Sequence, residues 1–368
     1  MFKTGVAGAA AFMINRNAFA LAQGSNRTYS ARAIEVVREA LVIDMLAPLK
    51  IDFRPDFFDK PFGETTKEEF RRSGITGFHH AVGLGGFNAR ERAKEYLASW
   101  SFFAGSQADL FTLVDTAADL DRAKADGKIA VILGIQNADH FQRPEDVLYF
   151  YRMGLRCSQL TYNSQNFIGS GSTDRVDGGL SDFGASIVAA MNEVGMLVDV
   201  SHCGEKTAID AIEASSKPIA ITHSNCRALN DHVRNKGDEA IRKLAAKEGV
   251  MGITEVRMFV KATDPVTVRD MADHIDHVVK LTGIEHVGIG SDSDLNGYDD
   301  MPPDQYAALK ASYKDSYQFR GKVDTDGFDH PLKTFDLAEE LIRRGYTDDH
   351  IKLVLGGNFK RLLDRTWL

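Results

Sequence analysis

The stretch that most constrains the fold runs from Met196 to Arg234, where two short apolar runs, MLVDVSH and IAITHS, flank a helical pattern. Each run ends on or beside a histidine, His202 in the first and His223 in the second. A strand–helix–strand unit of this length requires parallel strands. Both histidines therefore emerge at the carboxyl end of one sheet, where α/β enzymes place their chemistry.

Similar apolar runs recur along the rest of the chain, and helical segments separate most of them. With the two histidine runs they make eight buried strand candidates, which predicts a (β/α)8 TIM-type barrel with extra C-terminal helices. A doubly wound open sheet is the alternative, but it requires a glycine fingerprint after the first strand, where this chain has MLAPLK. The other six candidates are ALVIDMLA, GITGFHHAVGL, KIAVILGIQ, CSQLTYN, VMGITEV and HVGIGSD, and residues 88–127 are predicted to be helical, with Phe102 and Leu113 on the buried face.

The first 22 residues are typical of a signal peptide. Lys3 precedes an apolar run, and Ala20-Leu21-Ala22 has the small-residue pattern of a cleavage site. Phe2-Lys3 also resembles the tail of a twin-arginine signal whose arginines would lie upstream. We therefore expect an exported, periplasmic or extracellular protein whose mature part, residues 23–368, is one domain without a transmembrane span. A cytoplasmic protein with an N-terminal extension or a small core helix is the alternative.

Ionisable and amide side chains stand at the ends of the predicted strands, at the face where barrel enzymes act. Neutral imidazoles on rigid strands suit Zn²⁺, and a nearby carboxylate such as Asp292 suits proton transfer from water. The residue types alone thus indicate a metal hydrolase, with structural histidines as the alternative. The net charge of −8 and the lack of a basic cluster argue against a nucleic-acid partner.

Several longer motifs together make the chain, from about Ala40 onward, resemble the membrane (renal-type) dipeptidases. These enzymes hydrolyse dipeptides with two zinc ions bridged by a glutamate, and they are often homodimers. The motifs are GLRCSQLTYN, GLSDFG, LVDVSH, THSNCRAL, HVGIGSDSD and GGNFKRLL.

The resemblance implies a role for each candidate residue. His202 and His223 would bind one zinc, while Asp292 would bind the other and shuttle the proton. Arg234 would hold the terminal carboxylate of a dipeptide-like substrate, a task that suits the planar guanidinium fork. Tyr162 would stabilise the oxyanion in place of a histidine found in many members.

The chain departs from the family pattern at three metal positions. Leu46 and Pro48 stand where the family has a His-x-Asp pair, and the bridging glutamate falls on Gln136. We therefore expect a dipeptidase-like metallohydrolase with a degraded binuclear centre, in which Gln136 remains as a neutral ligand.

Three outcomes stay open for that centre. A single zinc could remain on His202 and His223, completed by Gln136, water or Asp292. A barrel without metal could bind a peptide-like or carboxylate ligand without zinc hydrolysis. Substitute metal ligands could come from Asp44, His79, His80 or His140.

The aromatic residues of 305–330 indicate either a cover over the pocket or a subunit interface.

Overall fold

The computed structural model describes residues 28–51, 60–298 and 301–368. The predicted signal segment, residues 1–22, lies outside these ranges, so export stays a prediction. In the described part of the chain, no helix is long and apolar enough to cross a membrane.

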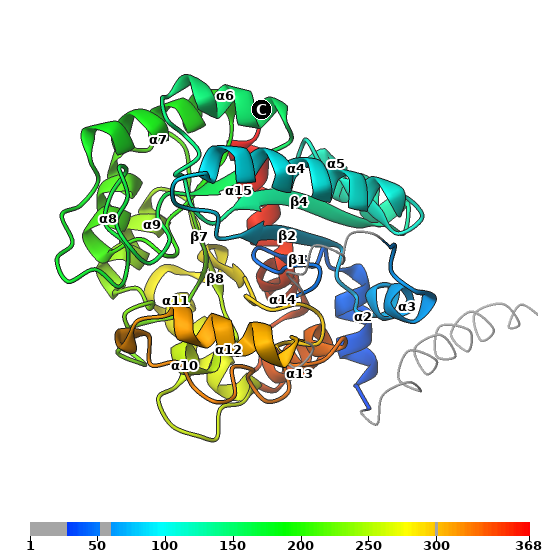
Figure 1. Ribbon diagram of the computed structural model, residues 1–368. Helices are drawn as coiled ribbons and strands as arrows, with labels where there is room; N and C mark the ends of the chain where they lie inside the picture. Colours follow the sequence, from blue (N-terminus) through cyan, green and yellow to red (C-terminus); the bar gives the residue numbers. More distant parts are fainter. Residues whose placement is uncertain (1–27, 52–59, 299–300) are drawn as a thin grey trace, which may run out of the picture.

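The core of the protein is a closed barrel of parallel strands with helices around it (Figure 1). Every neighbouring pair of strands is parallel, and the pairing of β2 with β4 closes the ring. The predicted (β/α)8 barrel is thereby confirmed, with all eight predicted strands in place. They are β1 (Ile43–Asp44), β2 (Gly77–Val82), β4 (Ile129–Ile135), β5 (Cys157–Gln159), β6 (Leu197–Asp199), β7 (Ala220–Ser224), β8 (Val250–Ile253) and β9 (Val287–Ile289).

Several helices begin or end at a capping residue. Ser30 and Ser181 cap α2 and α7 by accepting hydrogen bonds from the backbone of the first turn, and Gly195 ends α7 with φ 78°. The helices are α2 (Ala31–Glu39), α3 (Glu64–Arg72), α4 (Ala89–Ser106), α5 (Ala118–Ala125), α6 (Glu145–Arg152), α7 (Asp182–Val194), α8 (Glu205–Ala214), α9 (Asp238–Ala246), α10 (Arg257–Val260), α11 (Val268–Thr282), α12 (Pro303–Ser312), α13 (Lys333–Arg343), α14 (Asp348–Lys352) and α15 (Asn358–Thr366).

The sequence predicts that residues 88–127 are helical, but the structure divides them into several elements. They form α4, the short strand β3 (Phe111–Leu113) and α5, and β3 pairs with β4 outside the ring. Phe102, predicted to be buried, is 72% exposed, because the buried face of α4 runs through Leu97, Trp100 and Phe103 instead. Three residues of strand between two helices give too little alternation for a sequence pattern to reveal.

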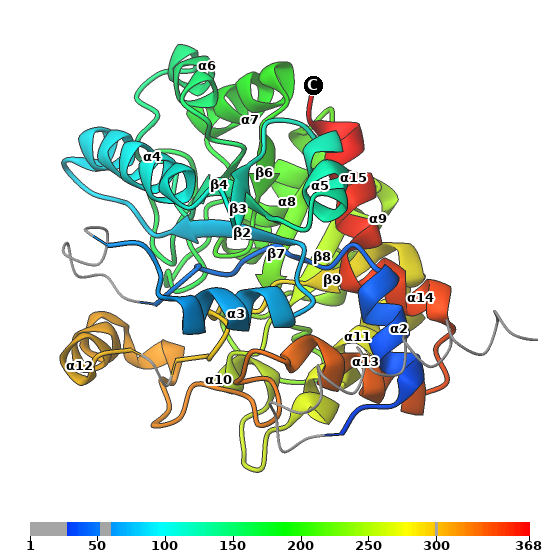
Figure 2. The same cartoon turned by 90° about the vertical axis from the view of Figure 1, so that its right-hand side faces the viewer.

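The two ends of the barrel are closed differently. Phe359 and Leu363 of α15 pack in one apolar cluster with Ile43, Ala130 and Ala220, which lie at the amino ends of their strands. Figure 2 shows α15 at that end and α12 beyond the carboxyl ends of the strands. The carboxyl end is therefore where the loops leave room for a site.

Candidate active site

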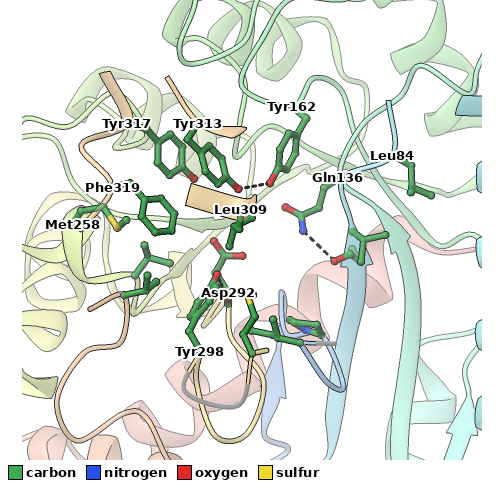
Figure 3. A pocket seen from close by; sticks show the side chains of 18 of the residues that line it. Leu84, Gln136, Tyr162, Met258, Asp292, Tyr298, Leu309, Tyr313, Tyr317 and Phe319 are labelled. Carbon is green, nitrogen blue, oxygen red and sulfur yellow. Dashed lines mark hydrogen bonds between the residues drawn. The ribbon is translucent and has the colours of Figure 1, made fainter. Parts of the chain in front are cut away.

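A pocket of about 360 Å³ opens at the carboxyl end of the barrel (Figure 3). Three of the predicted site residues line it: Gln136, Tyr162 and Asp292. The other three, His202, His223 and Arg234, are buried and are not part of its lining, and they are called the floor of the site below. The structure thus brings the predicted residues to one place.

The two histidines lie side by side, with ring centroids 4.9 Å apart. The Nδ1 atom of His202 is 2.7 Å from Asn163 Oδ1, and that of His223 is 2.8 Å from Thr222 Oγ1. Both Nε2 atoms are buried without a hydrogen-bond partner. Burial, followed by the positive charge of Arg234, lowers the pKa of both imidazoles well below the usual value. Both are therefore neutral and able to act as ligands through Nε2.

Arg234 is a buried cation without a carboxylate partner in the described residues. Its Nη1 donates a hydrogen bond to the carbonyl of Ser201 at 2.5 Å, while Nε and Nη2 have no acceptor. Burial raises the pKa of Tyr162 and of Asp292, which both line the pocket, and the Arg234 charge opposes this rise, so the guanidinium lies close to that space. An unpaired guanidinium with free donors is suited to bind a carboxylate.

Asp292 carries the carboxylate that faces the pocket (Figure 3). Its backbone adopts φ 65°, and it is fixed there because its amide donates to the Leu46 carbonyl at 2.8 Å and its carbonyl accepts from the Tyr298 hydroxyl at 2.8 Å. Removal from bulk water raises the pKa of the side chain to about 7, although Arg234 opposes the shift. A carboxyl group with such a pKa can both take up and release a proton near neutrality.

Tyr162 and Gln136 both line the pocket. The Tyr162 ring stacks on His202 at 4.3 Å, and its hydroxyl is 2.9 Å from that of Tyr313. Gln136 donates from Nε2 to the Ala81 carbonyl at 3.0 Å, which leaves its buried Oε1 without a partner. That oxygen is the only donor atom that Gln136 has free for a metal.

The residues of the pocket do not fit the two-zinc centre that the resemblance implies. Leu46 is completely buried and Pro48 lines the pocket, and neither side chain has a donor atom. In the ranges that the structure describes, no three His, Cys, Asp or Glu side chains gather as a group that could hold a metal ion. Among the predicted ligands, His202, His223, Gln136 and Asp292 keep a donor atom, so these are the residues that could hold an ion.

The four residues considered as substitute ligands are buried and form contacts of their own, although Nε2 of His79 and His80 and both ring nitrogens of His140 have no hydrogen-bond partner in the described residues. Asp44 accepts a hydrogen bond from the amide of Ser291 at 2.8 Å, and Nδ1 of His80 accepts one from the amide of Leu49 at 3.1 Å. The ring of His140 packs against aromatic neighbours. The structure does not bring them together with the two site histidines into a metal-binding group: Asp44, His79, His80 and His140.

Sequence reasoning missed part of the pocket wall. Tyr313, Tyr317 and Phe319 line the pocket, which agrees with the expectation that residues 305–330 cover it. Tyr298 lines it too and was not predicted, although its place six residues after Asp292 in a polar loop was a usable signal. Homodimer formation stays a prediction.

A closed parallel barrel with histidines, an arginine and an aspartate at its carboxyl end defines a protein of the barrel-hydrolase class. The chain belongs to the membrane dipeptidase family, peptidase family M19, whose model matches residues 31–309.

Individual relatives agree with this membership. Dipeptidase verJ of Clonostachys rogersoniana is 33% identical over 260 residues, which are 70% of this chain and 60% of that protein. An uncharacterized dipeptidase of Schizosaccharomyces pombe is 35% identical over 49% of this chain and 45% of its own length. The chain thus matches about half of each of these relatives. The crystal structure of an amidohydrolase from Pseudomonas aeruginosa is 30% identical with a TM-score of 0.79, covering 91% of this chain and 99% of that one.

Proposed function

We propose that this protein is a hydrolase of dipeptides or similar small amides, working with a metal centre reduced to one site. The observation that carries the proposal is the completely buried guanidinium of Arg234, with two free donors, beside two buried imidazoles with free Nε2 atoms. A ligand carboxylate at Arg234 and a metal ion at the two imidazoles would together satisfy these buried polar atoms.

The ligand would enter with its terminal carboxylate towards Arg234. Nε and Nη2 of the guanidinium would donate to the carboxylate oxygens and satisfy two buried donors. The pocket volume of about 360 Å³ lies at the lower end of the range for small-molecule sites. A dipeptide-sized ligand is therefore favoured over a longer peptide.

Asp292 and Tyr162 would serve the reaction itself. With a pKa of about 7, Asp292 can accept a proton from the attacking water and pass it to the leaving amine. The hydroxyl of Tyr162 can donate to the developing oxyanion if Tyr313, 2.9 Å away, donates to Tyr162 in turn.

His202 and His223 would hold the metal through their free Nε2 atoms, with Oε1 of Gln136 as the neighbouring neutral donor. Zinc at such a site supplies Lewis-acid polarisation of the scissile carbonyl and makes water more acidic. The Nδ1 contacts to Asn163 and Thr222 would fix the orientation of both rings.

A second candidate is a barrel that binds a carboxylate ligand without zinc hydrolysis. The observation that favours it is the position of Arg234, whose positive charge lowers the pKa of both histidines and would oppose a bound dication as well. Neither imidazole nor the Gln136 amide carries negative charge to offset it.

The metal content of the purified protein, after removal of loose ions, separates the two candidates when measured with dipeptide hydrolysis. About one zinc per chain, lost in His202→Ala together with hydrolysis, supports the hydrolase. A protein that binds dipeptides but neither retains zinc after reconstitution nor hydrolyses them is the second candidate. A protein that neither binds nor hydrolyses dipeptides contradicts both candidate functions.

A further inference from the structure

Four aromatic side chains, Tyr298, Tyr313, Tyr317 and Phe319, line one side of the pocket and are called the aromatic wall below (Figure 3). The rings of Tyr313 and Tyr317 stack at 4.2 Å with planes 19° apart, and Phe319 stacks on Tyr313 at 5.6 Å. Stacked rings that hold one another in place form a rigid surface rather than a set of independent side chains.

The wall turns mostly carbon towards the pocket. The hydroxyl of Tyr298 is used by the carbonyl of Asp292, and those of Tyr313 and Tyr162 bond to each other. Other side chains near the wall extend the apolar surface. They are Val256, Met258, Met301, Leu309 and Val323.

Charged groups are scarce around this space. Arg92 and Asp292 are the only charged side chains in the described lining, and Arg92 bonds to the carbonyl of Gly85. An apolar group that fills the space would therefore remove apolar surface from water without stranding a charge.

The wall adjoins the carboxylate receptor. The guanidinium carbon of Arg234 is 5.3 Å from the centre of the Phe259 ring, and that ring is 5.4 Å from the Tyr317 ring in an edge-to-face contact. The Arg234 charge also acts on the Tyr317 hydroxyl. A ligand whose carboxylate meets Arg234 thus carries its adjacent side chain, that of the carboxyl-terminal residue, next to the wall.

We propose that the aromatic wall is the specificity subsite for the carboxyl-terminal residue of the ligand and selects an aromatic or large apolar side chain there. This inference rests on the proposed function, because it takes Arg234 as the carboxylate receptor. It adds a substrate class that His202, His223 and Arg234 alone do not define.

Binding of non-cleavable dipeptide analogues tests the inference independently of turnover. Ketomethylene analogues of Ala-Phe, Phe-Ala and Ala-Ala would be titrated calorimetrically into the purified full chain. We expect the Ala-Phe analogue to bind about tenfold or more tightly than the other two, because only it places a ring on the wall. Phe319→Ala should reduce this preference to about threefold or less, because it removes one ring of the wall.

Two further variants make the result interpretable. Phe102→Ala, the same change at an exposed position of α4, is the matched control and should bind like the wild type. Phe319→Leu keeps apolar volume if the alanine variant unfolds, and it should retain an intermediate preference.

The possible outcomes test the specificity subsite and the proposed function separately. Equal affinities for Ala-Phe and Ala-Ala, or an unchanged preference in the Phe319 variants, overturn the wall as a specificity subsite and leave the proposed function standing. No binding of any analogue overturns both. A preference for Phe-Ala also contradicts the inference, since it places the ring on the amino-terminal residue.

Discussion

The Tyr162 ring lies nearly parallel to that of His202, with centroids 4.3 Å apart and planes at 21°. Its hydroxyl reaches the other way, to Tyr313 at 2.9 Å. One side chain therefore connects the histidine floor with the aromatic wall. The stacking and the hydroxyl can be tested separately, because phenylalanine keeps the first and removes the second.

Tyr162→Phe should lower kcat for dipeptide hydrolysis about 100-fold with little change in KM, because an oxyanion donor acts in the transition state. Tyr313→Phe breaks the same hydrogen bond but keeps the Tyr162 hydroxyl, so its effect should be much smaller. Steady-state kinetics of both variants check this. Equal losses would mean that only the bond between the two hydroxyls matters.

Arg234→Met should stabilise the ligand-free protein while it removes ligand binding. The guanidinium is completely buried, forms no ion pair in the described residues and leaves two donors unsatisfied. Methionine of similar length avoids that penalty, and we expect a gain of about 1–3 kcal/mol in the free energy of unfolding. Affinity for a dipeptide should fall about 30-fold or more.

Denaturation in guanidinium chloride and calorimetric titration measure the two effects of that substitution. Arg92→Met, at the arginine that lines the pocket, is the control for a change of the same kind at an exposed position. A destabilised Arg234→Met protein would show that Arg234 serves the fold, and the carboxylate receptor would then lose its main support.

The barrel could be predicted from the sequence because its signals are local. Each buried strand is a short apolar run between helical patterns, and Ser30, Ser181 and Gly195 set helix ends by their own backbone chemistry. The two histidines at the ends of β6 and β7 follow from the same logic, since parallel strands end on one side.

What could not be predicted depends on contacts between distant segments. Lys333 of α13 is buried against Ser293 and the carbonyl of Asp294. Burial raises the pKa of Glu255 well above its usual value, and the positive charge of Lys333 opposes that rise. No spacing in the sequence indicates this contact. Likewise, Tyr313 meets Tyr162 across 151 positions of the chain.

His80 gives the protein an acid-sensitive stability. The ring is completely buried, packs against Trp100 with ring centroids 3.6 Å apart, and has its pKa lowered to about 3 by burial and then by His79. In the unfolded chain its pKa is about 6.5. Stability is therefore fully present above pH 6.5 and is lost as the pH falls towards 3, by about 1.4 kcal/mol per pH unit.

The variant His80→Gln should flatten the decline of unfolding free energy below pH 6.5 by about this amount per unit. Denaturation series at several pH values give the slope, which does not depend on how stable the variant is at neutrality. His350→Gln on the surface is the control for the same chemical change. An unchanged slope in His80→Gln would contradict the assignment.

The last prediction concerns Leu46, Pro48 and Gln136, which stand where the resemblance implies metal ligands. Leu46→His, Pro48→Asp and Gln136→Glu together should raise bound zinc from at most one to about two ions per chain, because they add an imidazole and two negative charges beside His202. Carboxylates offset the charge of a second dication, which an amide cannot do. Elemental analysis of the purified variant measures the change.

A double variant, Leu46→Asn with Pro48→Asn, separates charge from space in that experiment. It removes the same apolar groups but adds no negative charge, so we expect its zinc content to stay at the wild-type level. If it gains zinc equally, room rather than charge limits the site. If the triple variant gains none, the added carboxylates pair with Arg234 instead of a metal, and zinc is then excluded by the same guanidinium that is proposed to hold the ligand.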